Sequence, residues 1–90
     1  MRDRKQILGV LKDTGPDGEA VTGIIEELSD TLGKTRKLVK KNEGKAEQTA
    51  GCLKSAVSNI EDAIVMSAIS LAPPVGMDEI LSLTETEEGK

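Results

Sequence analysis

Few residues in this chain have the types and spacing that a chemical site requires. Gly33, Lys34 and Thr35 match the end of a phosphate-binding P-loop. That motif needs another glycine five positions before its Gly-Lys pair, where this chain has Leu28, and it follows a strand. No strand is predicted here, so the sequence predicts no nucleotide site.

The acidic turn after the first apolar run bears a weak likeness to a calcium loop. If Asp13 is the first position, a glycine falls at the sixth place, as the loop requires. The twelfth place, which should supply a bidentate glutamate, is Ile24, and the third place is Gly15. We therefore interpret this segment as a plain turn and predict no metal site.

Catalysis and cofactor binding are not indicated by the composition. The chain has no histidine, which removes the commonest general base at neutral pH. Its single cysteine, Cys52, can form neither an internal disulfide nor a zinc site. We expect a non-enzyme without a cofactor, in the cytoplasm or another reducing compartment.

A block of six cations is the most serious candidate for a binding site. It could attract nucleic-acid phosphates or an acidic protein partner, although the chain has no aromatic residue to stack on bases. A solvated helix face is the other interpretation, and a small helical nucleic-acid-binding regulator is the alternative function. The block comprises Lys34, Arg36, Lys37, Lys40, Lys41 and Lys45.

The C-terminal segment is amphipathic and acidic. It could fold into a groove on a partner, fold back on the rest of the chain, or remain a disordered tail. Its apolar side chains are Met77, Ile80, Leu81 and Leu83.

The element that carries most of these candidate residues is indicated by a seven-residue repeat of apolar positions from Val21 to Ser67. Ten of its fourteen positions are apolar, although only 37% of the whole chain is hydrophobic. A helix with such an apolar stripe can bury it only against other helices. Because the chain has 90 residues and no aromatic side chain, a compact monomer would be marginal, which also favours assembly.

The pattern predicts an all-α chain in four parts: a short helix at 1–12, a turn at 13–18, a long helix at 19–72 and a flexible acidic tail at 73–90. A short helix at 78–83 can form in the tail. Pro73 and Pro74 end the long helix. The N-terminal helix can pack back through Ile7, Leu8 and Leu11.

Glycines inside the long helix leave a second arrangement open. Gly33 or Gly44 could end one helix and start another, which would give a hairpin bundle. Asn42 lies on the apolar stripe, where it could fix the register between chains or mark a weak segment.

We therefore expect an oligomerisation scaffold or adaptor that presents several tails to a protein partner. The helices are expected to associate in parallel, as a tetramer before a trimer or dimer, because the flanks of the stripe are also partly apolar. No segment has the roughly 20 apolar residues of a membrane span, so no membrane association is expected. The expected interface comprises Val21, Ile25, Leu28, Leu32, Thr35, Val39, Asn42, Ala46, Thr49, Leu53, Ala56, Ile60 and Ala63.

Overall fold

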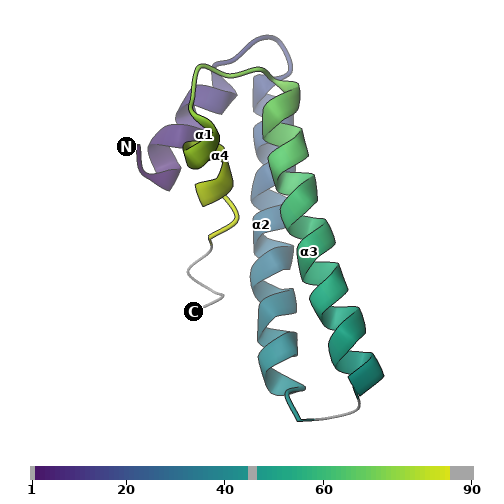
Figure 1. The fold of residues 1–90 in the computed structure, drawn as a ribbon. Coiled ribbons are helices and arrows are strands. Elements are labelled where there is room, and N and C mark those ends of the chain that lie inside the picture. Colours follow the sequence, from purple (N-terminus) through teal and green to yellow (C-terminus); the bar gives the residue numbers. More distant parts are fainter. Residues whose placement is uncertain (1, 45–46, 86–90) are drawn as a thin grey trace.

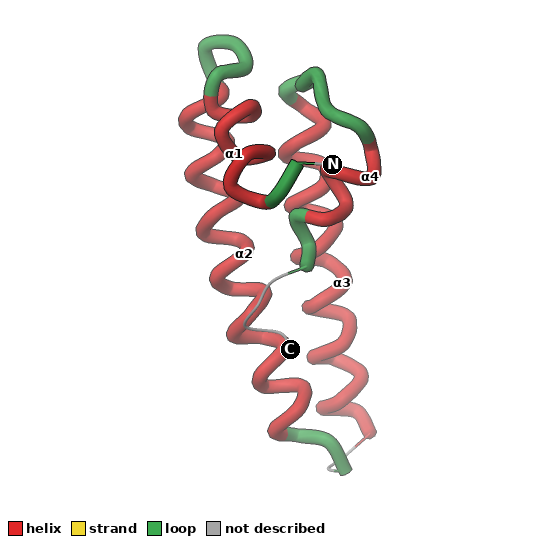
Figure 2. The backbone as a smooth tube through the Cα atoms, turned by 90° about the vertical axis from the view of Figure 1, so that its left-hand side faces the viewer, coloured by secondary structure: helices red, strands yellow, loops and turns green. Residues whose placement is uncertain are grey.

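The computed structural model describes residues 2–44 and 47–85, which form helices joined by turns and contain no strand. The helices are α1 (Arg4–Lys12), α2 (Gly18–Lys41), α3 (Glu47–Ser70) and α4 (Met77–Ser82). Helices α2 and α3 lie side by side as an antiparallel hairpin, and α1 and α4 lie against one side of it (Figures 1 and 2). The longest dimension of the molecule is 45 Å.

The continuous helix expected over 19–72 is wrong for this chain. The apolar stripe is divided between two helices of 24 residues each, and they bury much of it against each other. The hairpin alternative with a break at Gly44 is therefore the arrangement observed. Gly33, the other candidate for the break, lies buried inside α2.

Two residues explain why α2 ends where it does. Gly44 has a φ of 81°, a left-handed conformation that glycine adopts without steric cost. Asn42 occupies the C-cap, and its side-chain amide donates a hydrogen bond to the Leu38 carbonyl at 2.8 Å. Asn42 therefore uses its polar group to close a helix end within its own chain.

Helix α1 packs back on the hairpin, as the sequence predicted. Its N-terminus carries a capping box, in which Asp3 and Gln6 each accept a hydrogen bond from the other's backbone N–H. Ile7 and Leu11 are completely buried, and Leu8 packs against the same cluster. The first residue of α2, Gly18, approaches the end of α1 so closely that a side chain does not fit there.

The flexible tail expected over 73–90 is wrong for the part of it that the structure describes. Ile80 and Leu83 are buried in the core, so residues up to Glu85 fold back on the chain, while 86–90 lie outside the described residues. Arg2 donates to the Glu79 carboxylate at 3.0 Å, and the Arg4 guanidinium donates to the Leu83 carbonyl at 2.7 Å. These contacts attach α4 to the start of the chain.

The core lies in the half of the hairpin where α2 begins and α3 ends, here called the proximal half. The apolar side chains that are buried within the described ranges are Ile7, Leu11, Ile25, Leu32, Ile64, Ala68, Ile80 and Leu83. In the distal half, next to Gly44, the apolar residues between α2 and α3 are only half-buried. The fold is thus closed at one end and open at the other.

The close crossing of α1 and α2 predicts opposite effects for two glycine substitutions. A Cβ at Gly18 would lie 2.5 Å from the Leu11 carbonyl oxygen and 2.6 Å from that of Lys12. Gly18→Ala should therefore lower the free energy of unfolding by about 1–3 kcal/mol. Gly23→Ala, at an α2 position with open space, should raise it by about 0.5–1 kcal/mol. Urea unfolding measures both, and equal effects would refute the close crossing.

The ion pair at α4 predicts a response to acid. The pKa of the Glu79 carboxyl is lowered below its usual 4.5, first by the hydrogen bond from the Gly76 N–H and further by Arg2. A lowered folded-state pKa contributes stability that is present above the unfolded pKa and lost as pH falls through the folded pKa. The protection factors of the α4 backbone amides against exchange, taken relative to the intrinsic rate at each pH, should therefore fall only below about pH 4.5. Glu79→Gln should remove this step, and an unchanged step in that variant would assign it to another group.

Candidate functional site

The expected interface residues do not form one surface: some lie in the interior of the hairpin, and the others lie on both of its sides. Ile25 and Leu32 are completely buried inside the chain. Thr49 is exposed, and Ala46 lies outside the described residues. The remaining members are half-buried: Val21, Leu28, Thr35, Val39, Asn42, Leu53, Ala56, Ile60 and Ala63. These half-buried residues are available for further contacts.

One side of the hairpin is covered by α1 and α4 in its proximal half. The Arg4 guanidinium of α1 donates to the Ser29 hydroxyl, and Thr22 is buried on the same flank of α2. Burial lowers the pKa of Arg4, and the nearby Glu26 carboxylate partly opposes that shift. Arg4 therefore joins α1, α2 and the segment after α4 on one side.

The opposite side of the hairpin has no charged residue along its centre. Ile24 and Thr31 follow Thr22 and Ser29 by two residues, which places them about 200° around the helix. Met66 likewise lies two residues from both Ile64 and Ala68 in α3. We call this surface the uncharged face; it comprises Ile24, Leu28, Thr31, Thr35, Leu38 and Asn42 of α2 and Cys52, Ala56, Asn59, Ala63, Met66 and Ser70 of α3.

The uncharged face exposes large apolar side chains. Ile24, Leu38 and Met66 are 51%, 47% and 67% exposed, although each belongs to a regular helix. Charged residues make up 31% of the chain, yet none occupies these twelve positions. Along its edge Asp30 and Lys34 pair with each other at 3.3 Å. An apolar surface with a charged edge is typical of a protein-interaction site.

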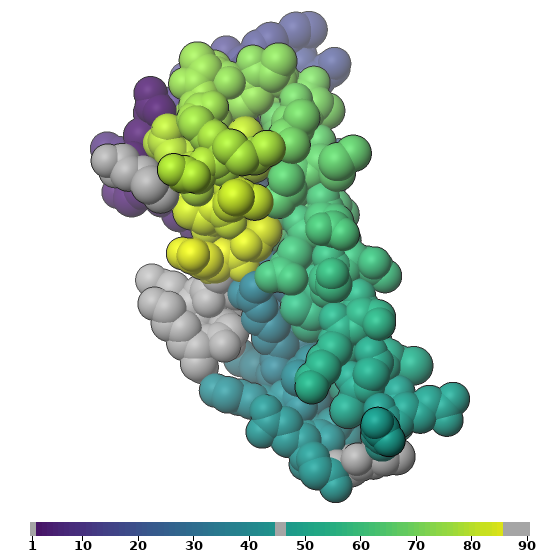
Figure 3. Space-filling model, viewed as in Figure 1, coloured from purple at the N-terminus to yellow at the C-terminus, as the bar shows by residue number. Residues whose placement is uncertain are grey.

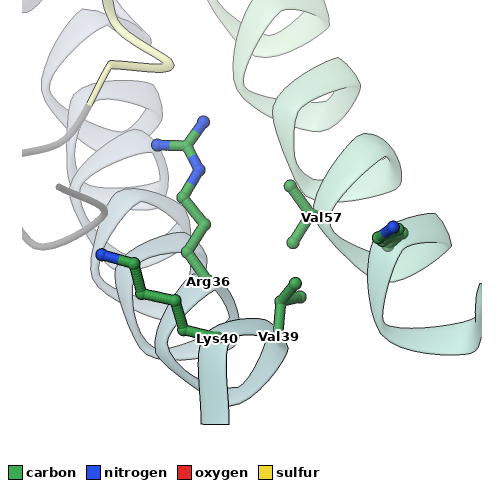
Figure 4. Close-up of a pocket in the computed structure, with 5 residues that line it drawn as sticks. Arg36, Val39, Lys40 and Val57 are labelled. Atoms are coloured by element: carbon green, nitrogen blue, oxygen red, sulfur yellow. The ribbon is translucent and has the colours of Figure 1, made fainter. Parts of the chain in front are cut away.

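The covered side becomes an open groove in the distal half. There α2 and α3 enclose a pocket of about 270 Å³. In Figure 4, Val39 and Val57 lie between the helices at its base, while the long side chains of Arg36 and Lys40 extend along its edge. Lys54 of α3 completes the lining. In Figure 3 the teal atoms of this distal region extend beyond α1 and α4, which cover only the proximal part. We call this pocket the basic groove.

The cations of the basic groove differ in what they contact. Arg36 pairs with Glu61 of α3 at 2.8 Å, which holds its guanidinium between the helices. Lys40 and Lys54 are exposed and form no ion pair within residues 2–44 and 47–85. They are therefore the groups that can meet an incoming anion.

The rest of the basic block does not face this groove as one surface. Lys34 is held by Asp30, and Lys37 and Lys41 are exposed on α2. Lys45 lies outside the described residues. The sequence identified Lys40 within a run of cations, but it gave no signal for Lys54, which lies fourteen residues further along and joins the groove only because the chain folds back at Gly44.

The C-terminal candidates are divided between core and surface. Ile80 and Leu83 are buried in the chain's own core, whereas Met77 and Leu81 are exposed on α4. Only the latter two remain available to a partner.

The described part of the chain contains no cluster of three or more acidic, cysteine or histidine side chains that could hold a metal ion. None of its helices has the length and apolar character needed to cross a membrane.

The two surfaces together describe a small helical molecule with one apolar side and one basic groove. Comparison with protein-family models, with curated proteins and with solved structures finds no match for this chain.

Proposed function

We propose that this chain is a self-associating scaffold in which two copies pack through their uncharged faces. The observation that supports the proposal is the run of twelve uncharged positions along one side of the hairpin, with exposed Ile24, Leu38 and Met66 among them. Burying such side chains against another copy removes apolar area from water and stabilises the pair. The sequence pattern predicts self-association, and the uncharged face is the surface through which we propose that it occurs.

The size of the uncharged face is sufficient for a stable pair. The face runs over 19 residues of each helix, from Ile24 to Asn42 and from Cys52 to Ser70, so it is about 27 Å long. Two helices about 10 Å apart make it about 20 Å wide. Each copy thus offers on the order of 540 Å², and a pair buries on the order of 1,100 Å² in total, just above the roughly 1,000 Å² that a biological interface needs.

Because the chain folds back on itself, fewer copies are needed to form a bundle of four helices. The sequence favoured four helices around one core, with one long helix from each chain. Because each chain contributes α2 and α3, two copies supply four helices. Ala56 and Ala63 have short side chains near the middle of the face, which allows the helices of the second copy to approach closely. A dimer of hairpins is therefore the assembly we propose.

The proposal predicts twice the mass of one chain in solution. Light scattering with mass determination should give about 19 kDa, twice the 9.5 kDa of the chain, at high concentration and a lower value on dilution. Cys52, which is exposed in the single chain and belongs to the uncharged face, should react more slowly with a thiol reagent in the dimer. A single-copy mass up to about 1 mM would overturn the proposal.

A matched pair of substitutions separates the uncharged face from a general charge effect. Ala56→Glu places a carboxylate in the middle of the face and should raise the dissociation constant at least about 100-fold, because an unpaired charge is then buried. Ser58→Glu adds the same charge at an exposed position of α3 outside the face and should leave the mass unchanged. Equal effects of the two variants would contradict the assignment of the interface to this face.

A further inference from the structure

The basic groove lies on the side of the hairpin where the chain already binds two short helices of its own. In the proximal half α1 packs on α2 and α4 packs on α3, so that side is closed (Figure 2). In the distal half the groove between α2 and α3 continues, with Val39 and Val57 half-buried at its base. The distal groove therefore has the apolar floor of a helix-binding surface, and none of the described helices lies on it.

Helix α4 shows what kind of segment this side of the hairpin binds. It is short, amphipathic and acidic, with Asp78 and Glu79 in its first turn. Its apolar residue Ile80 is buried, and its Glu79 carboxylate accepts from Arg2 at 3.0 Å. The binding of α4 thus combines an apolar contact in the core with a carboxylate–cation pair, whose cation Arg2 lies just before α1.

We propose that the basic groove binds an acidic amphipathic helix of a partner protein. Apolar side chains of that helix, three and four residues apart, rest on Val39 and Val57. Its carboxylates pair with Lys40 on one edge and Lys54 on the other, which have no ion-pair partner in the described ranges. Arg36 stays with Glu61 and fixes the distance between the helices.

The groove favours a protein helix over nucleic acid. Its base is apolar, and a phosphate backbone gains nothing from contact with valine side chains. The chain also lacks aromatic residues on which exposed bases could stack. The cations flank an apolar floor, which is the arrangement that an amphipathic helix complements on both counts.

The proposal is independent of self-association, because Lys40 and Lys54 lie on the other side of the hairpin from the uncharged face. A partner can occupy the groove of a single chain or of a dimer. The single-copy variant Ala56→Glu should therefore bind the partner helix as the unaltered chain does.

The experiment uses the full chain and a fluorescent, end-capped peptide of about fourteen residues, with leucines three and four apart and glutamates elsewhere. Fluorescence anisotropy measures its binding. Lys40→Glu and Lys54→Glu should each weaken binding about tenfold or more, because a carboxylate then meets a carboxylate. Both residues are exposed, so the helical circular dichroism should not change. Lys5→Glu, which reverses an exposed cation on α1, should leave binding unaltered.

Three outcomes would overturn the proposal. A peptide with lysines in place of the glutamates could bind equally well, which would leave no role for Lys40 and Lys54. Lys5→Glu could weaken binding as much as the groove variants, which would indicate general charge attraction. A duplex DNA could bind with steep salt dependence while the acidic peptide does not, which would assign the cations to phosphates.

Discussion

Two antiparallel helices cannot enclose an apolar stripe that is wider than the contact between them. In this chain the contact between α2 and α3 buries Ile25, Leu32 and Ile64, while residues on either side of that line stay partly exposed. Aliphatic side chains alone form the core, since the chain has no aromatic residue. Whatever covers the two flanks of the hairpin therefore decides how the molecule is stabilised and what it can bind.

The chain covers part of this surface by itself. Helices α1 and α4 close the proximal half on one side, and Arg4 holds them there through the Ser29 hydroxyl and the Leu83 carbonyl. Arg4 is partly desolvated in this position, and the nearby Glu26 carboxylate opposes the resulting fall in its pKa only in part. Among the described helices, none covers the distal half of that side or any part of the other side. The proposed partner helix and the proposed second copy each occupy one of these open regions.

Much of the fold could be predicted from the sequence because local signals agree with the final structure. The apolar periodicity predicted helical structure over the residues of α2 and α3, although as one continuous helix. Pro73 and Pro74 predicted the end of α3, and the amphipathic pattern predicted α1 and a short helix near α4. The break at Gly44 could only be stated as an alternative. One long helix and two antiparallel helices that pack along the same apolar stripe have the same seven-residue repeat in their sequences. Periodicity alone therefore does not show whether the chain reverses direction.

The candidate site was less accessible to sequence reasoning for the same reason. Ile24, Leu38, Cys52 and Met66 recur on one flank of the repeat, so the apolar part of the uncharged face was visible as a pattern. The basic groove was not, because Lys40 and Lys54 approach each other only after the chain reverses. The sequence predicted a flexible tail after Pro73, whereas α4 packs on the rest of the chain. The contacts of Arg2 and Arg4 that hold α4 join residues nearly eighty positions apart, so no local pattern indicates them.

The distribution of charge along α2 gives the molecule a polarity. Its first half carries Glu19, Glu26, Glu27 and Asp30, and its second half carries Lys34, Arg36, Lys37, Lys40 and Lys41. Two copies joined side by side in the same direction would bring like charges together at both ends, whereas opposite directions bring unlike charges together. In the latter arrangement the two basic grooves point to opposite ends of the pair. Such a pair would bridge two separate partners, rather than hold one partner at two places.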